Sequence, residues 1–147
     1  MSTYTQLLYH IVFSTKNRMR TLDLTNRERL LNYICGIIKQ KKSFVYQINM
    51  VEDHIHILCS IHCQENVSDL VKYIKNSTNI LIKNEHIFPM FDGWQKGYGA
   101  FTVNWREKQG LIDYIKNQQE HHKLHDFMAE YKKMLYEFGI SYEDKYL

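Results

Sequence analysis

The spacing of hydrophobic residues predicts the order of strands and helices along the chain. Residues 4–15 are rich in aromatic and β-branched side chains, which is typical of a central strand buried on both faces. The runs 44–51 and 54–62 are also strand-like, and the two acidic residues between them indicate a hairpin. A fourth strand is expected within 93–105, after a loop that contains several glycines.

Apolar residues at intervals of three and four predict helices between and after these strands. One such stripe covers about 26–41, and a second follows Asn66, which suits an N-cap. The resulting order of strand, helix, strand, strand, helix, strand predicts an α+β fold of the ferredoxin-like type, with both helices on one face of an antiparallel sheet. Two further helices, at about 110–122 and 126–138, are expected to cover the other face.

Length and composition agree with one globular domain. Of the 147 residues, 44% are hydrophobic and 24% are charged, which excludes disordered and collagen-like chains. We expect one domain over residues 1–147, with a core at about 4–105 and C-terminal helices at about 110–139. No apolar run approaches the ~20 residues that span a bilayer, and the first residues lack the order of a signal peptide. A cytoplasmic protein with no membrane partner is therefore expected.

Positive charge is concentrated at the start of the chain. The net charge is only +3, but residues 1–50 contain eight Lys or Arg against two Asp or Glu. A local excess of this kind suits a nucleic acid, although a solvated lysine-rich helix gives the same count. Cys35, Cys59 and Cys63 form no C-x-x-C pair, and we expect them to be reduced, structural thiols.

Two histidines in the predicted third strand could share one metal ion. His54 and His56 are two positions apart, so their rings project from the same face with Cα atoms about 6.6 Å apart. Pairs of solvated or hydrogen-bonded histidines have the same spacing. Ile55, Ile57 and Cys59 alternate to the opposite face and are expected in the core under the helices, which leaves the histidines on the other side.

A tyrosine and a glutamine in the expected helix 110–122 are spaced to share one face. Tyr114 and Gln118 are four residues apart, which is about one helical turn. Each is ordinary alone, as a packing aromatic and a surface amide. In combination, a phenol beside a metal-binding amide oxygen can be a nucleophile aimed at a phosphate that the metal polarises. Because a phenol ordinarily has a pKa of ~10, attack near neutral pH would need positive charge or a base nearby.

Three short motifs follow in order along the chain: D-H-I-H-I-L at 53–58, G-Y-G-A-F at 97–101 and I-D-Y-I-K-N-Q at 112–118. Together they resemble the single-tyrosine HUH transposases of simple insertion sequences and the related REP-associated tyrosine transposases. The resemblance covers nearly the whole chain. It implies that His54, His56 and Gln118 hold a divalent metal, Mg²⁺ or Mn²⁺. It also implies that Tyr114 is the nucleophile that becomes joined to a DNA 5′-phosphate.

The resemblance further implies how DNA and a second chain are bound. Lys16, Arg18 and Arg20 match a basic segment that would contact phosphates, with a solvated basic turn as the alternative. The expected partner is single-stranded DNA with hairpin ends. We expect a homodimer in which the tyrosine helix can complete the partner's histidine site, with residues 108–110 as a flexible joint. The REP-associated relatives can act as monomers.

Two other groups of side chains have more than one interpretation. Trp94, Tyr98 and Phe101 are candidates for stacking on unpaired bases, although Tyr98 and Phe101 differ in strand parity and at most one of them is expected to face DNA. A histidine cluster follows the tyrosine helix, and its members are either exposed helix-end residues or additional contacts of the metal site: His121, His122 and His125.

The function that the resemblance implies is metal-dependent cleavage and strand transfer of single-stranded DNA through a covalent 5′-phosphotyrosine intermediate, the chemistry of transposition. No nucleotide cofactor is expected, because the covalent link conserves bond energy and the chain has no G-x-x-x-x-G-K-[ST] loop. Three alternatives stay open. They are a non-catalytic single-stranded nucleic-acid-binding module, a hydrolase in which water attacks, and a domesticated HUH endonuclease that cuts DNA without mobilising an element.

Overall fold

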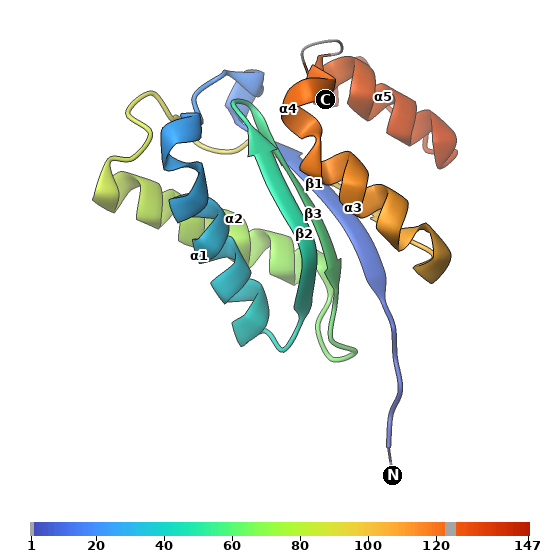
Figure 1. The fold of residues 1–147 in the computed structure, drawn as a ribbon. Coiled ribbons are helices and arrows are strands. Elements are labelled where there is room, and N and C mark those ends of the chain that lie inside the picture. The colour runs from blue at the N-terminus through green and yellow to red at the C-terminus, as the bar shows by residue number, and fades with distance from the viewer. Residues whose placement is uncertain (1, 123–125) are drawn as a thin grey trace.

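A four-stranded antiparallel sheet forms the centre of the protein (Figure 1). The computed structural model describes residues 2–122 and 126–147, without the side chain of His122. The strand order is β2-β3-β1-β4, so the first strand is central, as predicted. The strands are β1 (Leu8–Ser14), β2 (Phe44–Val51), β3 (His54–Ser60) and β4 (Gly99–Thr102).

Helices cover both faces of the sheet (Figure 1). On one face lie α1 (Arg27–Gln40) and α2 (Val67–Glu85), and on the other lie α3 (Lys108–Lys116), α4 (Gln118–His122) and α5 (Phe127–Glu137). The described residues also form short 3-10 helices: η1 (Lys16–Arg18), η2 (Leu24–Asn26) and η3 (Trp105–Glu107) between these elements, and η4 (Asp144–Tyr146) after α5. The order up to β4 is β-α-β-β-α-β, which confirms the expected α+β fold with its additional C-terminal helices.

Successive side chains of each strand point to opposite faces of the sheet, and each face has its own apolar core. Odd-numbered side chains of β1 and β3, such as Ile11 and Ile57, are buried against α1 and α2 in the larger core. On the opposite face, Val12 and Phe101 pack with α5 in a smaller one. Even-numbered side chains of β3 therefore face the C-terminal helices, and the helices that the sequence placed over the open face do cover it.

The expected flexible joint at residues 108–110 is wrong, because these residues form the first turn of α3. The side chain of Asn104 accepts a hydrogen bond from the backbone N–H of Arg106, and η3 continues directly into α3. Gln109 also donates a side-chain hydrogen bond to Asp113, one turn further along. The helix therefore begins earlier than predicted, and it ends at Lys116 with Asn117 as its C-cap. The single helix expected at 110–122 is thus divided into α3 and α4, between the tyrosine and the glutamine of interest.

None of the helices in the described part of the chain combines the length and the apolar character that crossing a membrane requires.

Candidate active site

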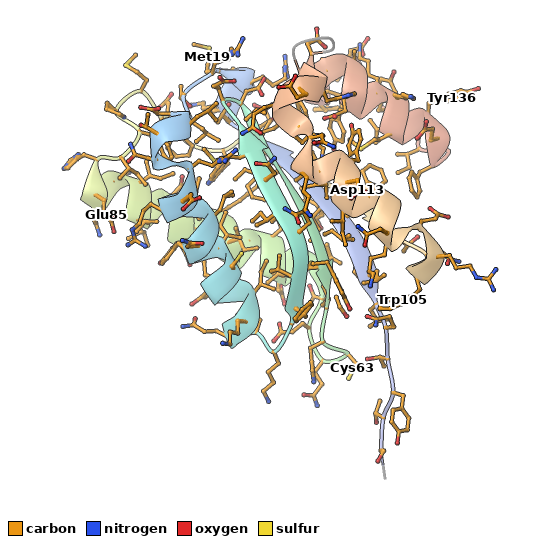
Figure 2. The ribbon with its side chains drawn as sticks, viewed as in Figure 1. Met19, Cys63, Glu85, Trp105, Asp113 and Tyr136 are labelled. Atoms are coloured by element: carbon orange, nitrogen blue, oxygen red, sulfur yellow. The ribbon has the colours of Figure 1, made fainter. Side chains whose placement is uncertain are left out.

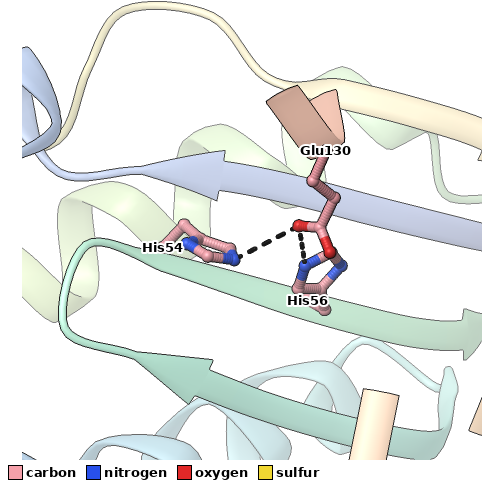
Figure 3. Close-up of side chains that lie close together, drawn as sticks. All are labelled: His54, His56 and Glu130. Carbon is pink, nitrogen blue, oxygen red and sulfur yellow. Dashed lines mark hydrogen bonds and ion pairs between the residues drawn. The ribbon is translucent and has the colours of Figure 1, made fainter. Parts of the chain in front are cut away.

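The two histidines of β3 lie fully buried under α5 (Figure 3). Nε2 of His54 is 3.5 Å from Oε1 of Glu130, and Nε2 of His56 is 3.0 Å from the same oxygen. The ligand atoms of these three residues all lie within 4.8 Å of one another. The same-face geometry predicted for the histidines is confirmed, and the face is closed rather than open to solvent.

Hydrogen bonds on the far side of each ring fix the orientation of the histidines. Nδ1 of His54 is 2.7 Å from a carboxylate oxygen of Asp53, and Nδ1 of His56 is 2.8 Å from Nε2 of His10. Burial, with a smaller contribution from His56, lowers the pKa of His10 to about 3, so this ring is neutral and has one donor and one acceptor nitrogen. In the tautomer in which Nε2 of His10 is the acceptor, Nδ1 of both β3 histidines carries a proton, and Nε2 of each is left to bind a cation.

The approach of Nε2 of both histidines to one carboxylate oxygen needs a proton or a metal ion between the atoms. Ring protons can meet this need, because hydrogen bonds to Asp53 and Glu130 outweigh the effect of burial and raise the pKa of His54. A divalent metal ion can replace those protons. Imidazole nitrogens with a carboxylate form a donor set that divalent metals accept.

Tyr114 extends from α3 into the same cluster. Its hydroxyl donates a hydrogen bond to Oε2 of Glu130 and lies 3.4 Å from Nε2 of His121. Burial and the neighbouring Glu130 carboxylate raise the pKa of the Tyr114 phenol well above its usual value. The phenol is therefore protonated in this arrangement, and it shares its carboxylate with the two histidines.

Gln118 brings an amide group to the same carboxylate. Its Nε2 lies 3.3 Å from Oε2 of Glu130, and the residue is fully buried. The amide oxygen of Gln118 has no hydrogen-bond partner within the described ranges. A buried oxygen without a partner is energetically unfavourable, and coordination of a metal ion would satisfy it. The residues present therefore fit the divalent ion that the sequence implied.

Glu130 was not predicted from the sequence. It is 5% exposed and lies on α5, where the apolar stripe of the predicted helix continues through Phe127, Met134 and Leu135. Residue 130 is three positions after Phe127 and four before Met134, so a carboxylate interrupts the face that packs on the sheet. An acidic residue on the buried stripe is the signal that could have identified it.

The predicted basic segment lies beside the β2–β3 turn rather than in the buried cluster. The backbone N–H of Thr15 donates to the carbonyl of Asp53, and that of Leu22 donates to the carbonyl of Glu52. All three basic side chains have partners: Lys16 pairs with Asp92 at 3.7 Å, Arg20 with Glu52 at 2.9 Å, and Arg18 with the terminal Leu147. The segment therefore borders the turn that leads into His54.

Other candidate residues divide between the core and the site. Trp94 and Phe101 are buried, whereas Tyr98 is 38% exposed, so only one of the pair Tyr98 and Phe101 faces outward, as parity predicted. His121 contacts Glu130 at 3.2 Å. His125 and the side chain of His122 lie outside the described residues.

Cys59 and Cys63 do not lie on the sheet face that presents the histidines. Cys59 belongs to the opposite core, and Cys63 is exposed beyond the far end of β3 (Figure 2).

Comparison with known proteins identifies the relatives of this chain. A curated relative, the ISDra2 transposase TnpA of Deinococcus radiodurans, is 24% identical over 120 residues, which cover 78% of this chain and 86% of the relative. A crystal structure of a candidate transposase from Deinococcus radiodurans R1 has a TM-score of 0.62 at 24% identity, and covers 80% of this chain and 95% of that one.

A second solved structure is the REP-associated tyrosine transposase bound to a REP hairpin. It has a TM-score of 0.64 at 16% identity and covers 83% of this chain and 74% of that chain. These two structures support the fold. The family model described as "Transposase IS200 like" matches residues 3–118, which is most of the sequence. The chain therefore belongs to the IS200-like transposase family.

Proposed function

We propose that this transposase-family enzyme cleaves single-stranded DNA and transfers the strand through a covalent link to Tyr114. One observation supports the proposal most directly: the Tyr114 hydroxyl and Nε2 of both β3 histidines meet the two oxygens of one buried carboxylate, Glu130. A nucleophile and a cation site that share a carboxylate are close enough to act on one phosphate.

His54 and His56 are the proposed nitrogen ligands of a divalent ion, Mg²⁺ or Mn²⁺. Gln118 supplies an amide oxygen, and Glu130 supplies the carboxylate that already faces both rings. The Nδ1 partners of the histidines hold the rings in place, which strengthens such ligands. When bound, the ion polarises the scissile phosphate.

Tyr114 performs the covalent step. The phenolic oxygen forms a bond to phosphorus while the bond from phosphorus to the 3′ oxygen breaks, leaving a 5′-phosphotyrosine. The phenolic proton passes to Glu130, which already accepts its hydrogen bond, and a proton from solvent completes the free 3′-hydroxyl. Attack of another 3′-hydroxyl on the phosphotyrosine reverses these changes and joins the strand to a new end.

The proposed substrate is single-stranded DNA with a hairpin. Two observations support it: one structural relative was solved with a REP hairpin, and the basic segment from Lys16 to Arg20 lies beside the turn that precedes His54. Backbone contacts from such a segment would give affinity without reading sequence.

The test is the formation of a protein–DNA adduct. Wild-type protein, Tyr114→Phe and a control, Tyr131→Phe, are incubated with labelled hairpin DNA and Mn²⁺. Tyr131 is a partly buried tyrosine on α5, and it packs on Phe127. We expect a denaturation-resistant adduct with wild type and with the control, and none with Tyr114→Phe.

The products also separate the rival functions. Cleavage that continues in Tyr114→Phe would show that water attacks. Binding without cleavage by any of the three proteins would show a binding module. An equal adduct from all three would remove Tyr114 from the mechanism.

A further inference from the structure

A cavity of about 530 Å³ lies between β4, α3 and α5, next to the candidate active site. Three large apolar side chains form much of its wall: Phe101 from the sheet, Leu111 from α3 and Phe138 from the end of α5. A hollow of this size is within the range of sites that enclose small organic groups.

The cavity is continuous with the cluster around the nucleophile. Tyr114, His121 and Glu130 line it as well, so a group held there would touch the residues that the proposed reaction uses. Apolar side chains such as Phe101, Leu111 and Phe138 offer a phosphate no hydrogen bonds. The cavity therefore suits an uncharged, partly apolar part of the same substrate.

Aromatic rings in the wall provide a stacking surface. The ring centroids of Phe101 and Phe138 lie 4.8 Å apart with their planes tilted by 40°. Phe101 is buried, but Phe138 is 49% exposed, so its ring is accessible to a ligand. Stacking on an aromatic side chain is a common means of holding an unpaired nucleic-acid base.

Charged side chains at the edge of the cavity also favour a nucleic-acid base over a sugar–phosphate backbone. Glu107 and Glu137 both line it, and carboxylates accept hydrogen bonds from the exocyclic amino groups of bases but repel phosphates. Lys133, which lies 4.0 Å from Glu137, is the cation on the same rim and can contact a backbone phosphate outside.

From these contacts we infer that the cavity holds the base of the nucleotide whose 5′-phosphate becomes joined to Tyr114. The inference rests on the proposed function. In phosphoryl transfer the attacking and leaving oxygens are roughly in line on opposite sides of phosphorus. The leaving 3′ nucleotide therefore points away from Tyr114, and the nucleotide that stays attached is the one beside the tyrosine and its cavity.

The test begins by finding that nucleotide. DNA hairpins with randomised single-stranded flanks are incubated with wild-type protein and Mn²⁺, and sequencing of the protein-linked strand identifies the attached end. An oligonucleotide with an abasic analogue at that position is then compared with the intact one. At limiting DNA, wild type should form adduct about 5- to 100-fold faster with the intact base.

Variants assign this preference to the cavity. Phe138→Ala removes the exposed ring, and Ala129→Trp fills the hollow from α5; either should bring the ratio between intact and abasic DNA close to one. Phe44→Ala, which removes an exposed ring on β2, should keep the wild-type ratio. A wild-type ratio in both cavity variants would overturn the inference, and so would equal rates for the two DNAs with wild type.

A binding measurement separates this inference from the proposed function. If no adduct forms, the proposed function fails, and 2-aminopurine is placed in turn at each unpaired position of the hairpin. Fluorescence quenching at one position that disappears in Phe138→Ala would support the cavity as a base site. Equal quenching with Phe138→Ala, or none at any position, would overturn it.

Discussion

Glu130 joins the parts of the site because its two carboxylate oxygens face different groups. One oxygen lies against the ring nitrogens of His54 and His56, and the other accepts the hydrogen bond of Tyr114. A buried carboxylate is stable only when such partners neutralise or hydrogen-bond it. The same residue can therefore bind a metal ion and hold the phenol in position.

Replacing Glu130 tests its role as a metal ligand. Glu130→Gln keeps the size of the side chain but removes its charge, so Mn²⁺ affinity should fall by about 10- to 100-fold. Glu137→Gln removes the same charge from an exposed position on α5 and should bind Mn²⁺ like wild type. Titration calorimetry or the EPR signal of free Mn²⁺ measures the affinity without DNA.

The opposite result would assign the oxygen ligand to Gln118. Unchanged Mn²⁺ affinity in Glu130→Gln, with a loss in Gln118→Ala, would make the glutamine the oxygen ligand. Glu130 would then serve only as the acceptor of the Tyr114 proton.

Residues whose roles follow from local spacing could be found in the sequence. Strand alternation placed His54 and His56 together. A spacing of four residues placed Gln118 near Tyr114, although the two lie in consecutive helices, α4 and α3, rather than on one. Glu130 could not be found in this way, because its contact with His56 spans 74 residues and depends on how α5 packs on the sheet. His10 has the strand parity of Val12, which allows a place near the metal site or in the core, and the pairing of β1 with β3 brings it to His56.

At the scale of elements, the close approach of α5 to β4 depends on a glycine. A Cβ atom at Gly99 would lie 2.7 Å from Cε1 of Tyr131 on α5, closer than packed atoms allow. Tyr131 in turn stacks on Phe127, next to His54. The glycine therefore lets α5 lie close enough to bring Glu130 over the sheet.

Adding that methyl group should loosen the C-terminal layer. We expect Gly99→Ala to lower the free energy of unfolding by about 1–3 kcal/mol, as overpacking does in other cores. Gly36→Ala is the control: Gly36 lies within α1 with no atom near its added Cβ, and the change should raise stability by about 0.5–1 kcal/mol. Urea denaturation measures both. Equal stability of Gly99→Ala and wild type would show that Tyr131 moves aside freely.

The segment around η1 is the element that we expect to contact the DNA backbone. Replacing Lys16, Arg18 and Arg20 with alanine should weaken binding of single-stranded DNA. It should also flatten the salt dependence by ~0.7 log units for each lost phosphate contact. Fluorescence anisotropy at several salt concentrations measures the slope, and Mn²⁺ affinity should not change.

A second triple variant controls for net charge. Lys39, Lys83 and Lys145 are exposed and lie on α1, on α2 and near the C-terminus. Alanine at these three positions should leave the salt slope near that of wild type. If both triple variants change the salt slope equally, the basic segment has no specific part in DNA binding.

The element order was predictable because each element has its own pattern. The ends of β2 agree with the prediction, and Asn66 caps α2 through its side chain. The start of α3 was less accurate, since Gly110 suggested a joint where η3 instead continues into the helix. A glycine in a helix is unfavourable by only about 1 kcal/mol, which neighbouring turns can offset.

At the scale of the whole molecule, three layers place a complete set of site residues within one chain. The sheet contributes the histidines and α5 the carboxylate (Figure 3), and α3 contributes the tyrosine. The rings of His56 and Tyr114 lie 5.9 Å apart, centroid to centroid, in the same chain. Within the described residues, the arrangement thus needs no residue from a partner, whether or not the expected homodimer forms.

Mixing two inactive variants tests whether sites are shared. His54→Ala lacks a proposed ligand and Tyr114→Phe lacks the nucleophile, so neither should form an adduct alone. Because the tyrosine meets the histidines of its own chain, we expect the mixture to be inactive as well. Light scattering gives the mass of each sample, where 17.8 kDa corresponds to a monomer.

The two measurements together decide between the possible assemblies. A dimeric mass with no adduct from the mixture would mean that each chain of the dimer uses its own tyrosine. A dimeric mass with adduct recovery towards one quarter of the wild-type level would mean that α3 and α4 exchange between chains, since random mixing makes half of the dimers mixed and each mixed dimer carries one intact site of its two. Such recovery would require the contacts of Tyr114 and of His121 with Glu130 to break within a chain and to form again with the partner.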